Sequence, residues 1–252
     1  MNKNSTKDTY FNYDQQYQRM LNRRPTELVT ASVVSTYSPP WLKGVTKDVA
    51  VLDVGCGYGY QLLLLSRLGF NNLHGIEASH SSHRIACEEL AGLAELELAD
   101  AFEYLPEKKE TYDLIILNDV LEHIPREKTV ELLVLIHDAL HENGKVVIRV
   151  PNMSSLLAQY SMYLDFTHIV GFTEFSLMQC LDWADFHNHQ VVTRRAGIDL
   201  KTWRPWRPFR RLGLGRLLND WVHKVFYFIR QQSPKPTTYD YNLELWSVKA
   251  PG

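Results

Sequence analysis

The sequence has few cysteines and no long apolar run. Its three cysteines are odd in number and lack C-x-x-C spacing, so we expect reduced thiols and no disulfide framework. No segment approaches the roughly 18 consecutive apolar residues that span a bilayer. The polar start, Met1 to Asp8, is not followed by an apolar stretch either. These absences predict a cytoplasmic protein that is neither exported nor membrane-spanning.

Metal-ligand spacing is also absent. His80, His83 and Cys87 would share one face of a helix, but this group has no fourth ligand. The acidic residues Asp100, Asp119 and Glu122 follow predicted strands without the spacing of a metal-binding loop. The sequence therefore identifies no metal site, and it leaves open whether a divalent metal assists the reaction.

The net charge of -2 conceals a strong asymmetry along the chain. Between Arg194 and Lys235 there are eleven basic residues and two acidic ones, so this segment carries +9 and the remainder carries -11. Such a division favours a local anionic partner. General binding of nucleic acid is not expected, because the rest of the chain is acidic and has no RNA-binding motif.

Residues 49–60 read V-A-V-L-D-V-G-C-G-Y-G-Y, a buried-strand pattern that leads into three glycines at alternate positions. A backbone without side chains at Gly55, Gly57 and Gly59 can approach a bulky ligand closely. The dinucleotide-binding fingerprint spaces its glycines as G-x-G-x-x-G. Here the third glycine comes one position early, and Tyr60 occupies the position that the fingerprint gives to glycine. This departure argues against a nicotinamide or flavin dinucleotide.

Strand-like and helix-like segments alternate through the middle of the chain. We predict strands at 49–54, 73–76, 96–98, 112–117 and 145–150, with helical segments such as 60–68 and 127–141 between them. Such alternation produces a parallel sheet with helices on both faces. The helix at 127–141 should stop at Asn143-Gly144 and bury one apolar stripe. That stripe consists of Val130, Leu133, Val134, Ile136 and Leu140.

Ligands of an open parallel sheet bind beyond the carboxyl ends of its strands. The pattern D-x-G-x-G-x-G from Asp53, followed by Glu77, resembles the cofactor loop of class I S-adenosylmethionine-dependent methyltransferases. The string L-N-D-V-L-E-H-I-P at 117–125 resembles the segment after the fourth strand in the same superfamily. The resemblance implies an α/β fold, a Rossmann-like doubly wound sheet of seven strands that is mostly parallel with an antiparallel last strand.

The resemblance also implies S-adenosyl-L-methionine as the cofactor. Glu77 would hold the ribose hydroxyls, and Asn118 would lie close to the methionine part. The Asp100 side chain and the Ala101 amide would contact the adenine edge. The expected cofactor-binding residues are Asp53, Gly55, Cys56, Gly57, Gly59, Glu77, Ala78, Asp100, Ala101, Asn118 and Asp119.

Residues 163–175 follow the fifth predicted strand, where this fold usually builds its acceptor pocket. This segment contains the string D-F-T-H, and the string G-F-T-E-F-S-L follows at 171–177. Both resemble strings found in methyltransferases of bacterial surface-polysaccharide biosynthesis. An alcohol must lose its proton on methylation, and a positioned base contributes about 10²–10⁴-fold to such a step. We predict His168 as the base, with Asp165 fixing its tautomer or contacting the sugar, and His123 as a second candidate. Alternatively, Asp165 and His168 only hold the loop by hydrogen bonds, and His123 is structural or lies in the cofactor shell.

The last quarter of the chain departs from the alternation. A sixth strand is expected within 188–198, followed at 203–209 by a proline-broken stretch of tryptophans and arginines. From Leu214 to Arg230, apolar residues recur at helical spacing with basic residues between them, which predicts an amphipathic basic helix. Such a helix can lie in an anionic membrane interface, cover an active site or pair with another subunit. The segment 241–248 suits the last antiparallel strand.

The chain is therefore expected to contain four parts. They are an N-terminal helical cap at 1–45, a cofactor-binding core at 46–200, a basic amphipathic insertion at 201–236 and the final core strand at 237–252. Within the cap, one or two helices are predicted at 14–37, with Pro25 as a break.

The sequence predicts O-methylation of a sugar hydroxyl in a cell-surface glycan or a lipid-linked glycan precursor. A lipid-linked glycan carries both a diphosphate and a membrane anchor, which suits arginines beside an apolar helix, and residues 203–230 would contact the inner membrane surface. A quinone or another lipophilic small molecule is the alternative acceptor. The alternative outside enzymes is a regulatory or scaffold subunit that binds S-adenosylmethionine without transferring its methyl group.

Overall fold

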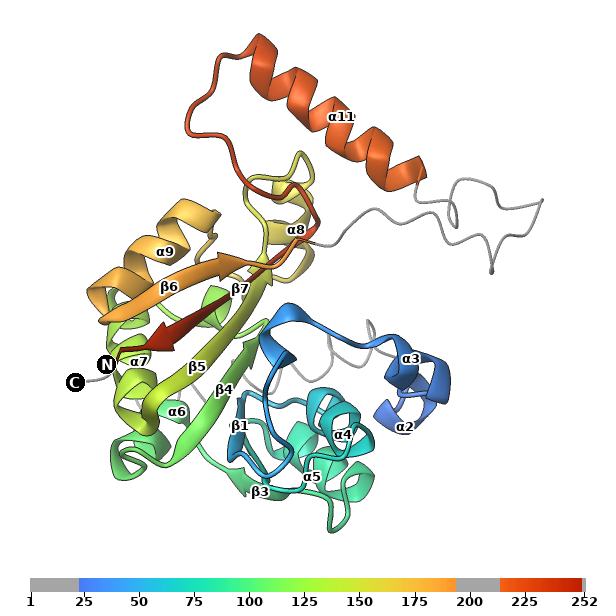
Figure 1. Ribbon diagram of the computed structural model, residues 1–252, viewed down its shortest axis with the longest axis vertical. Coiled ribbons are helices and arrows are strands. Elements are labelled where there is room, and N and C mark those ends of the chain that lie inside the picture. Colours follow the sequence, from blue (N-terminus) through green and yellow to red (C-terminus); the bar gives the residue numbers. More distant parts are fainter. Residues whose placement is uncertain (1–22, 194–213, 251–252) are drawn as a thin grey trace.

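The computed structural model describes residues 23–193 and 214–250. These residues form a seven-stranded sheet in the order β3-β2-β1-β4-β5-β7-β6 (Figure 1). Strand β7 is antiparallel to its neighbours β5 and β6, and the other neighbouring pairs are parallel. The predicted doubly wound sheet with an antiparallel last strand is confirmed.

The strands form where apolar and β-branched residues run together. Their bounds are β1 Val51–Val54, β2 Leu73–Glu77, β3 Glu95–Leu98, β4 Tyr112–Asn118, β5 Leu140–Pro151, β6 Phe186–Val191 and β7 Asn242–Lys249. The first five agree closely with the predicted strands, except that β5 begins five residues before the predicted Lys145.

Helices surround this sheet (Figure 1). Their bounds are α2 Pro25–Leu28, α3 Ala31–Thr36, α4 Tyr60–Arg67, α5 His80–Glu89, α6 Ala101–Tyr104, α7 Arg126–Ala139, α8 Ala158–Leu164, α9 Glu174–Trp183 and α11 Leu214–Ile229. Three short 3-10 turns are η1 Pro40–Leu42, η2 Leu105–Glu107 and η3 Leu121–His123. Side-chain caps begin several helices; Thr173, for example, exchanges hydrogen bonds with Ser176 at the start of α9.

The sheet separates two apolar cores, because successive residues of a strand point to opposite faces. In β4, Leu114 and Ile116 belong to the core that contains the leucines of α4. Their neighbours Ile115 and Leu117 belong to the core that contains the buried faces of α7 and α9. Burial on both faces explains why β4 is an almost continuous apolar run.

Helix α7 differs from its prediction in two respects. It ends at Ala139, so Asn143, which has the expected left-handed φ of 62°, lies within β5, where the register against β4 shifts, and does not stop the helix. Leu133 and Ile136 are buried as predicted, but Val134 is 40% exposed. The buried stripe contains Leu132 instead, which keeps the spacing of three and four residues that one helical face requires.

Two other predicted boundaries were displaced. Strand β6 begins at Phe186, earlier than the predicted 188–198, because this buried phenylalanine pairs with Lys249 of β7; residues 194–198 lie outside the described residues. In the N-terminal cap, Pro25 starts α2, since proline suits the first helical position, and the predicted helix at 14–22 lies outside the described residues. The segment predicted from Thr26 to Val34 is not continuous, because a second helix, α3, starts after Thr30, whose side chain caps it.

Helix α11 lies between β6 and β7 in the chain, as the predicted insertion requires. It projects from the body of the molecule on the side of α8 (Figure 1). Among the helices in the described ranges, none is long and apolar enough to cross a membrane. The proline-broken stretch at 203–209 lies outside these ranges.

Candidate active site

A tight turn after β1 contains the three glycines of the sequence motif. Gly55, Gly57 and Gly59 have left-handed φ values of 67°, 55° and 84°, which favour glycine. A Cβ atom at Gly55 would lie 2.8 Å from Val120 Cγ2. A Cβ atom at Gly59 would lie 2.5 Å from Leu90 Cδ1. The turn therefore requires glycine for its backbone conformation and for its packing.

Glu77, the last residue of β2, lies beside this turn. Its Oε2 atom accepts a hydrogen bond from the Gly57 amide at 2.9 Å, and its Oε1 atom accepts one from the Ser79 amide at 2.8 Å. The two amides hold the carboxylate at the glycine turn. A carboxylate has about four lone-pair positions, so Glu77 can also accept from the hydroxyls of a ligand.

Asp53 is buried within β1, with 2% of its surface exposed. Its Oδ1 atom has no hydrogen-bond partner among the described residues. Burial raises the pKa of Asp53 to about 8; Arg149 opposes this shift and Glu77 adds to it. A buried carboxyl oxygen without a partner is uncommon in folded proteins and marks a position that a ligand donor would satisfy.

The remaining predicted cofactor residues lie at the carboxyl ends of neighbouring strands. The Asp100 side chain accepts from the Phe102 amide at 2.8 Å and caps α6, which begins at Ala101. The Cys56 amide donates to the Ile76 carbonyl at 3.0 Å and joins the glycine turn to β2. Ala78 follows β2, and Asn118 and Asp119 end and follow β4. Strands β3, β2, β1 and β4 are consecutive in the sheet, so these positions form one edge.

Arg149 of β5 forms an ion pair with Asp119, to which it donates through Nη2 and Nε. Burial opposes the charge of Arg149, but Asp119 and Glu244 hold its pKa above the usual value. The positive charge of the same guanidinium favours the ionised forms of Asp53 and Glu122. It therefore opposes the rise in pKa that burial causes at both carboxyl groups. Arg149 was not identified from the sequence. The feature that could have indicated it is a single arginine within the apolar run V-V-I-R-V.

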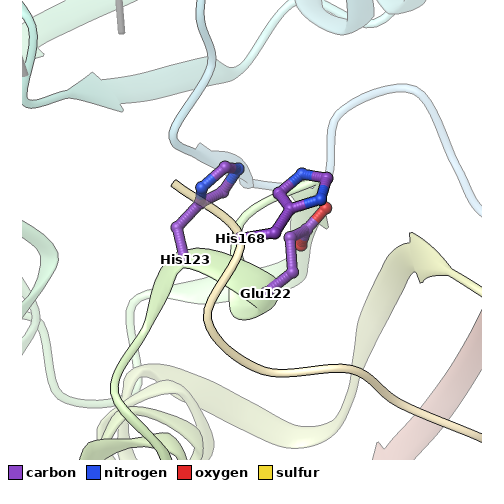
Figure 2. Close-up of side chains that lie close together, drawn as sticks. All are labelled: Glu122, His123 and His168. Atoms are coloured by element: carbon purple, nitrogen blue, oxygen red, sulfur yellow. The ribbon is translucent and has the colours of Figure 1, made fainter. Parts of the chain in front are cut away.

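Glu122, His123 and His168 lie together where η3 meets the loop after α8 (Figure 2). One nitrogen or carboxylate oxygen from each residue lies within 4.8 Å of those from the other two. The imidazole rings meet edge to face, with centroids 4.8 Å apart. Glu122 is only 1% exposed, and neither of its carboxylate oxygens has a hydrogen-bond partner within the described residues. Burial, and then the charge of Asp119, raises the pKa of Glu122 well above its usual value.

Asp165 is connected to His123 through Thr167. Asp165 Oδ1 accepts from the Thr167 hydroxyl at 2.6 Å and from its amide at 2.8 Å. His123 Nδ1 lies 2.9 Å from that hydroxyl and 3.2 Å from the Thr167 carbonyl. Because a carbonyl only accepts, we assign the His123 proton to Nδ1. Burial, and then the neighbouring His168, lowers the pKa of His123.

The Ser161 carbonyl, and not Asp165, lies against the ring of His168. His168 Nδ1 is 3.1 Å from this carbonyl, so its proton is also assigned to Nδ1. The expected contact between Asp165 and the His168 ring is absent, because the loop turns so that the His168 amide donates to the Asp165 carbonyl at 3.2 Å. These hydrogen bonds hold the loop. Sequence reasoning gave Thr167 no specific role, although it lies in the D-F-T-H string, and it missed Ser161, which acts through its backbone carbonyl.

Comparisons with known proteins agree with this arrangement. A family described as "Methyltransferase domain" matches residues 13–191. No curated protein sequence matches significantly.

Solved structures share the fold at low sequence identity. A SAM-dependent methyltransferase from Archaeoglobus fulgidus has a TM-score of 0.65 at 21% identity, covering 94% of this chain and 100% of that one. A protein from Thermotoga maritima, described as a possible histamine N-methyltransferase, has a TM-score of 0.59 at 13% identity, with 96% of each chain covered. Phosphoethanolamine N-methyltransferase 2 from Haemonchus contortus, in complex with S-adenosyl-L-methionine, has a TM-score of 0.55 at 18% identity. That match covers 82% of this chain and 50% of the other.

Proposed function

The chain belongs to the methyltransferase-domain family and is an S-adenosylmethionine-dependent methyltransferase, and we propose that it methylates a sugar hydroxyl of a cell-surface glycan or its lipid-linked precursor. The observation that carries this proposal is a pair of histidines, His123 and His168, held by hydrogen bonds in the segments that follow β4 and α8. A hydroxyl acceptor needs a base, and an imidazole suits this task near neutral pH.

The residues at the carboxyl ends of the strands fit S-adenosyl-L-methionine. The bare backbone of the glycine turn admits a bulky ligand, and Glu77 offers a carboxylate to the ribose hydroxyls. The Oδ1 atom of Asp53, which has no hydrogen-bond partner within 23–193 and 214–250, supplies a further buried acceptor. When bound, this cofactor supplies an activated methyl group on a sulfonium. The protein must then align the acceptor, remove its proton and exclude water.

Proton removal is assigned to the histidine pair. With Nδ1 protonated in both rings, each Nε2 carries the lone pair that accepts a proton. Burial favours the neutral form of His123. The ring centroids are 4.8 Å apart, so two protonated rings would repel each other, and the pair takes up one proton and not two. The chain from Asp165 through Thr167 orients His123, as a third group orients the base in other nucleophile-activating sites. His168, which the sequence singles out, is the primary base.

The lipid-linked nature of the acceptor is supported by the orientation of α11. The face of α11 that meets the protein is polar: His223, only 1% exposed, accepts from the Leu156 amide at 2.8 Å, and Tyr227 donates to the Ser154 carbonyl at 3.1 Å. The opposite face is apolar and exposed. It carries Leu217, Leu218, Trp221, Val222, Phe228 and Ile229.

Exposed apolar residues also lie around α8 and in the loop that contains the proposed base. They are Leu157, Tyr160, Tyr163, Phe166 and Ile169. Exposed apolar side chains in such number indicate a binding surface. Because the insertion around α11 is strongly basic, we assign this surface to an anionic membrane interface, where apolar side chains enter the lipid and cations meet the headgroups. The protein would then bind peripherally at the inner membrane, next to a lipid-linked acceptor.

The acceptor can be identified by direct assay. Labelled S-adenosylmethionine is incubated with lipid-linked sugars, nucleotide-linked sugars and a quinol, and the products are analysed by mass. The proposal predicts methylation of a sugar hydroxyl. Methylation of the quinol alone would favour the lipophilic small-molecule acceptor, which the same apolar surface would suit. Cofactor binding without transfer to any acceptor class would favour a regulatory or scaffold subunit.

A further inference from the structure

The cluster of Glu122, His123 and His168 combines a buried acid with two imidazoles that are held in one tautomer. Buried carboxyl groups in folded proteins nearly always have hydrogen-bond partners. Glu122 has none for either oxygen within the described residues, and it is 1% exposed. The apposed imidazoles suggest what satisfies it, since a cation bound to both rings would also neutralise the carboxylate (Figure 2).

The two histidines have the surroundings of metal ligands. A metal-binding histidine usually donates its second ring nitrogen to a carbonyl, a carboxylate or water, which fixes the ring and the tautomer. His123 Nδ1 meets the Thr167 carbonyl and hydroxyl, and the hydroxyl is in turn bound to Asp165. His168 Nδ1 meets the Ser161 carbonyl. In both rings the Nε2 atom therefore carries the lone pair that a cation requires.

We propose that Glu122, His123 and His168 form a binding site for a divalent transition-metal cation of the Zn²⁺ class. Two imidazole nitrogens and one carboxylate are a set of three protein ligands that leaves a position open for water or substrate, as in catalytic zinc sites. Imidazole ligands select transition metals over Mg²⁺ and Ca²⁺, which prefer oxygen. Ligands of a tetrahedral zinc lie about 3.3 Å apart, given bonds of about 2.0–2.1 Å. One nitrogen or carboxylate oxygen of each residue now lies within 4.8 Å of the other two, and the side chains would move closer together around the ion.

The position of the cluster gives the cation a function, and this part of the inference rests on the proposed methylation of a hydroxyl. A coordinated hydroxyl loses its proton more readily, as water does on zinc. In the metal-loaded enzyme His168 would act as a ligand and no longer as the base, and the coordinated hydroxyl would release its proton to a solvent water; the histidine pair is the base of the metal-free enzyme. The binding of the cation itself does not depend on which acceptor is used.

Metal binding is measured directly on the full chain after chelation. Isothermal titration with Zn²⁺ and the absorption spectrum of added Co²⁺ are recorded for the wild type and for Glu122→Gln. The experiments use a Cys87→Ser background, because Cys87 Sγ lies 3.7 Å from His83 and this pair can take zinc by itself. We expect one equivalent of Zn²⁺ and at least about tenfold weaker binding in Glu122→Gln. His187→Ala, which alters an exposed histidine on β6, serves as the matched control and should not change the affinity.

Thermal melting separates this effect from a folding defect. Glu122→Gln should fold without metal, because it removes only a buried acid, and it should lose the increase in melting temperature that Zn²⁺ gives the wild type. Equal Zn²⁺ affinity in the wild type and Glu122→Gln, or no binding by either, would overturn the site. If zinc binds at this site but metal-free and loaded enzymes methylate equally fast, its catalytic function is overturned and the proposed methylation stands.

Discussion

The carboxylate of Asp165 is coupled to the imidazole of His123 through the hydroxyl of Thr167. The hydroxyl donates to Asp165 at 2.6 Å and lies 2.9 Å from His123 Nδ1. Because the hydroxyl proton goes to the acid, the hydroxyl oxygen accepts from the ring. An acid that does not touch the imidazole thus sets its tautomer and leaves the lone pair on Nε2.

The rate of methyl transfer should depend on pH through this pair. Only a neutral imidazole accepts a proton, and both burial and His168 lower the pKa of His123 below the ordinary 6.5. We therefore expect kcat to be constant at neutral pH and to fall only below a pH that is itself lower than 6.5. The profile is measured at saturating cofactor and acceptor. An acid limb above pH 7 would contradict a role for the histidines as neutral bases.

Replacing Asp53 by Asn should change how stability depends on pH. The folded-state pKa of Asp53 is raised to about 8, whereas an unfolded aspartate titrates at about 3.9. Between these values the folded state keeps a proton that the unfolded state loses, so Asp53 weakens stability as the pH rises. The free energy of unfolding is measured in urea without cofactor. The value for Asp53→Asn minus the value for the wild type should therefore increase from pH 5 to 8 and stay constant above pH 8.

The control for this experiment is Asp48→Asn. A hydrogen bond from Thr46 lowers the pKa of Asp48, so its ionised form is already present in both states at neutral pH. The difference in unfolding free energy between Asp48→Asn and the wild type should then be constant from pH 6 to 9. A constant difference for Asp53→Asn as well would show that Asp53 is ionised normally.

Substitution of Glu77 by Gln should weaken the binding of S-adenosylmethionine. Hydrogen bonds to a charged group contribute about 1.5–3 kcal/mol, which corresponds to roughly a 10- to 150-fold increase in Kd. The Kd is measured by isothermal titration. Glu95→Gln, which alters an exposed carboxylate on the neighbouring strand β3, should leave it unchanged. A change of less than threefold in Glu77→Gln would remove Glu77 from the cofactor site.

Membrane contact is tested with two tryptophans of equal exposure. Trp221 on α11 is 62% exposed and Trp183 on α9 is 63% exposed. If the apolar face of α11 enters lipid, Trp221→Glu should lower flotation with anionic liposomes severalfold, because a carboxylate is costly to bury and is repelled by the headgroups. Trp183→Glu should float like the wild type. Equal flotation of all three proteins would exclude α11 as the lipid-binding face.

The positions of the candidate cofactor residues could be predicted because the information that places them in the fold is local. The three glycines need their own left-handed backbone, and Glu77 and Asp100 end or follow single strands, so a motif and the strand pattern place them. Arg149 reaches the site from β5, and Ser161 acts from α8 through its backbone carbonyl. Contacts of this kind depend on how distant segments pack. The lone arginine in the run V-V-I-R-V marks Arg149 but does not indicate its partner, and nothing in the sequence near Ser161 indicates its contact.

The sequence could not predict which face of α11 contacts the rest of the protein, and the reason is different. Helical spacing separates an apolar face from a polar one, and the usual expectation is that the apolar face packs on the core. Here His223 and Tyr227 on the polar face contact the protein, and Trp221 points outward. The periodicity of the sequence defines the two faces but does not say which of them meets the rest of the chain.

The central claim is that the cofactor edge and the histidine cluster perform separate tasks, and His168→Ala tests it most directly. The Kd for S-adenosylmethionine and the rate of methyl transfer are measured on the same preparation. We predict a Kd within about twofold of the wild type and a transfer rate lower by at least about 100-fold, the smallest loss expected when a positioned base is removed. Wild-type turnover with unchanged cofactor affinity would contradict the account.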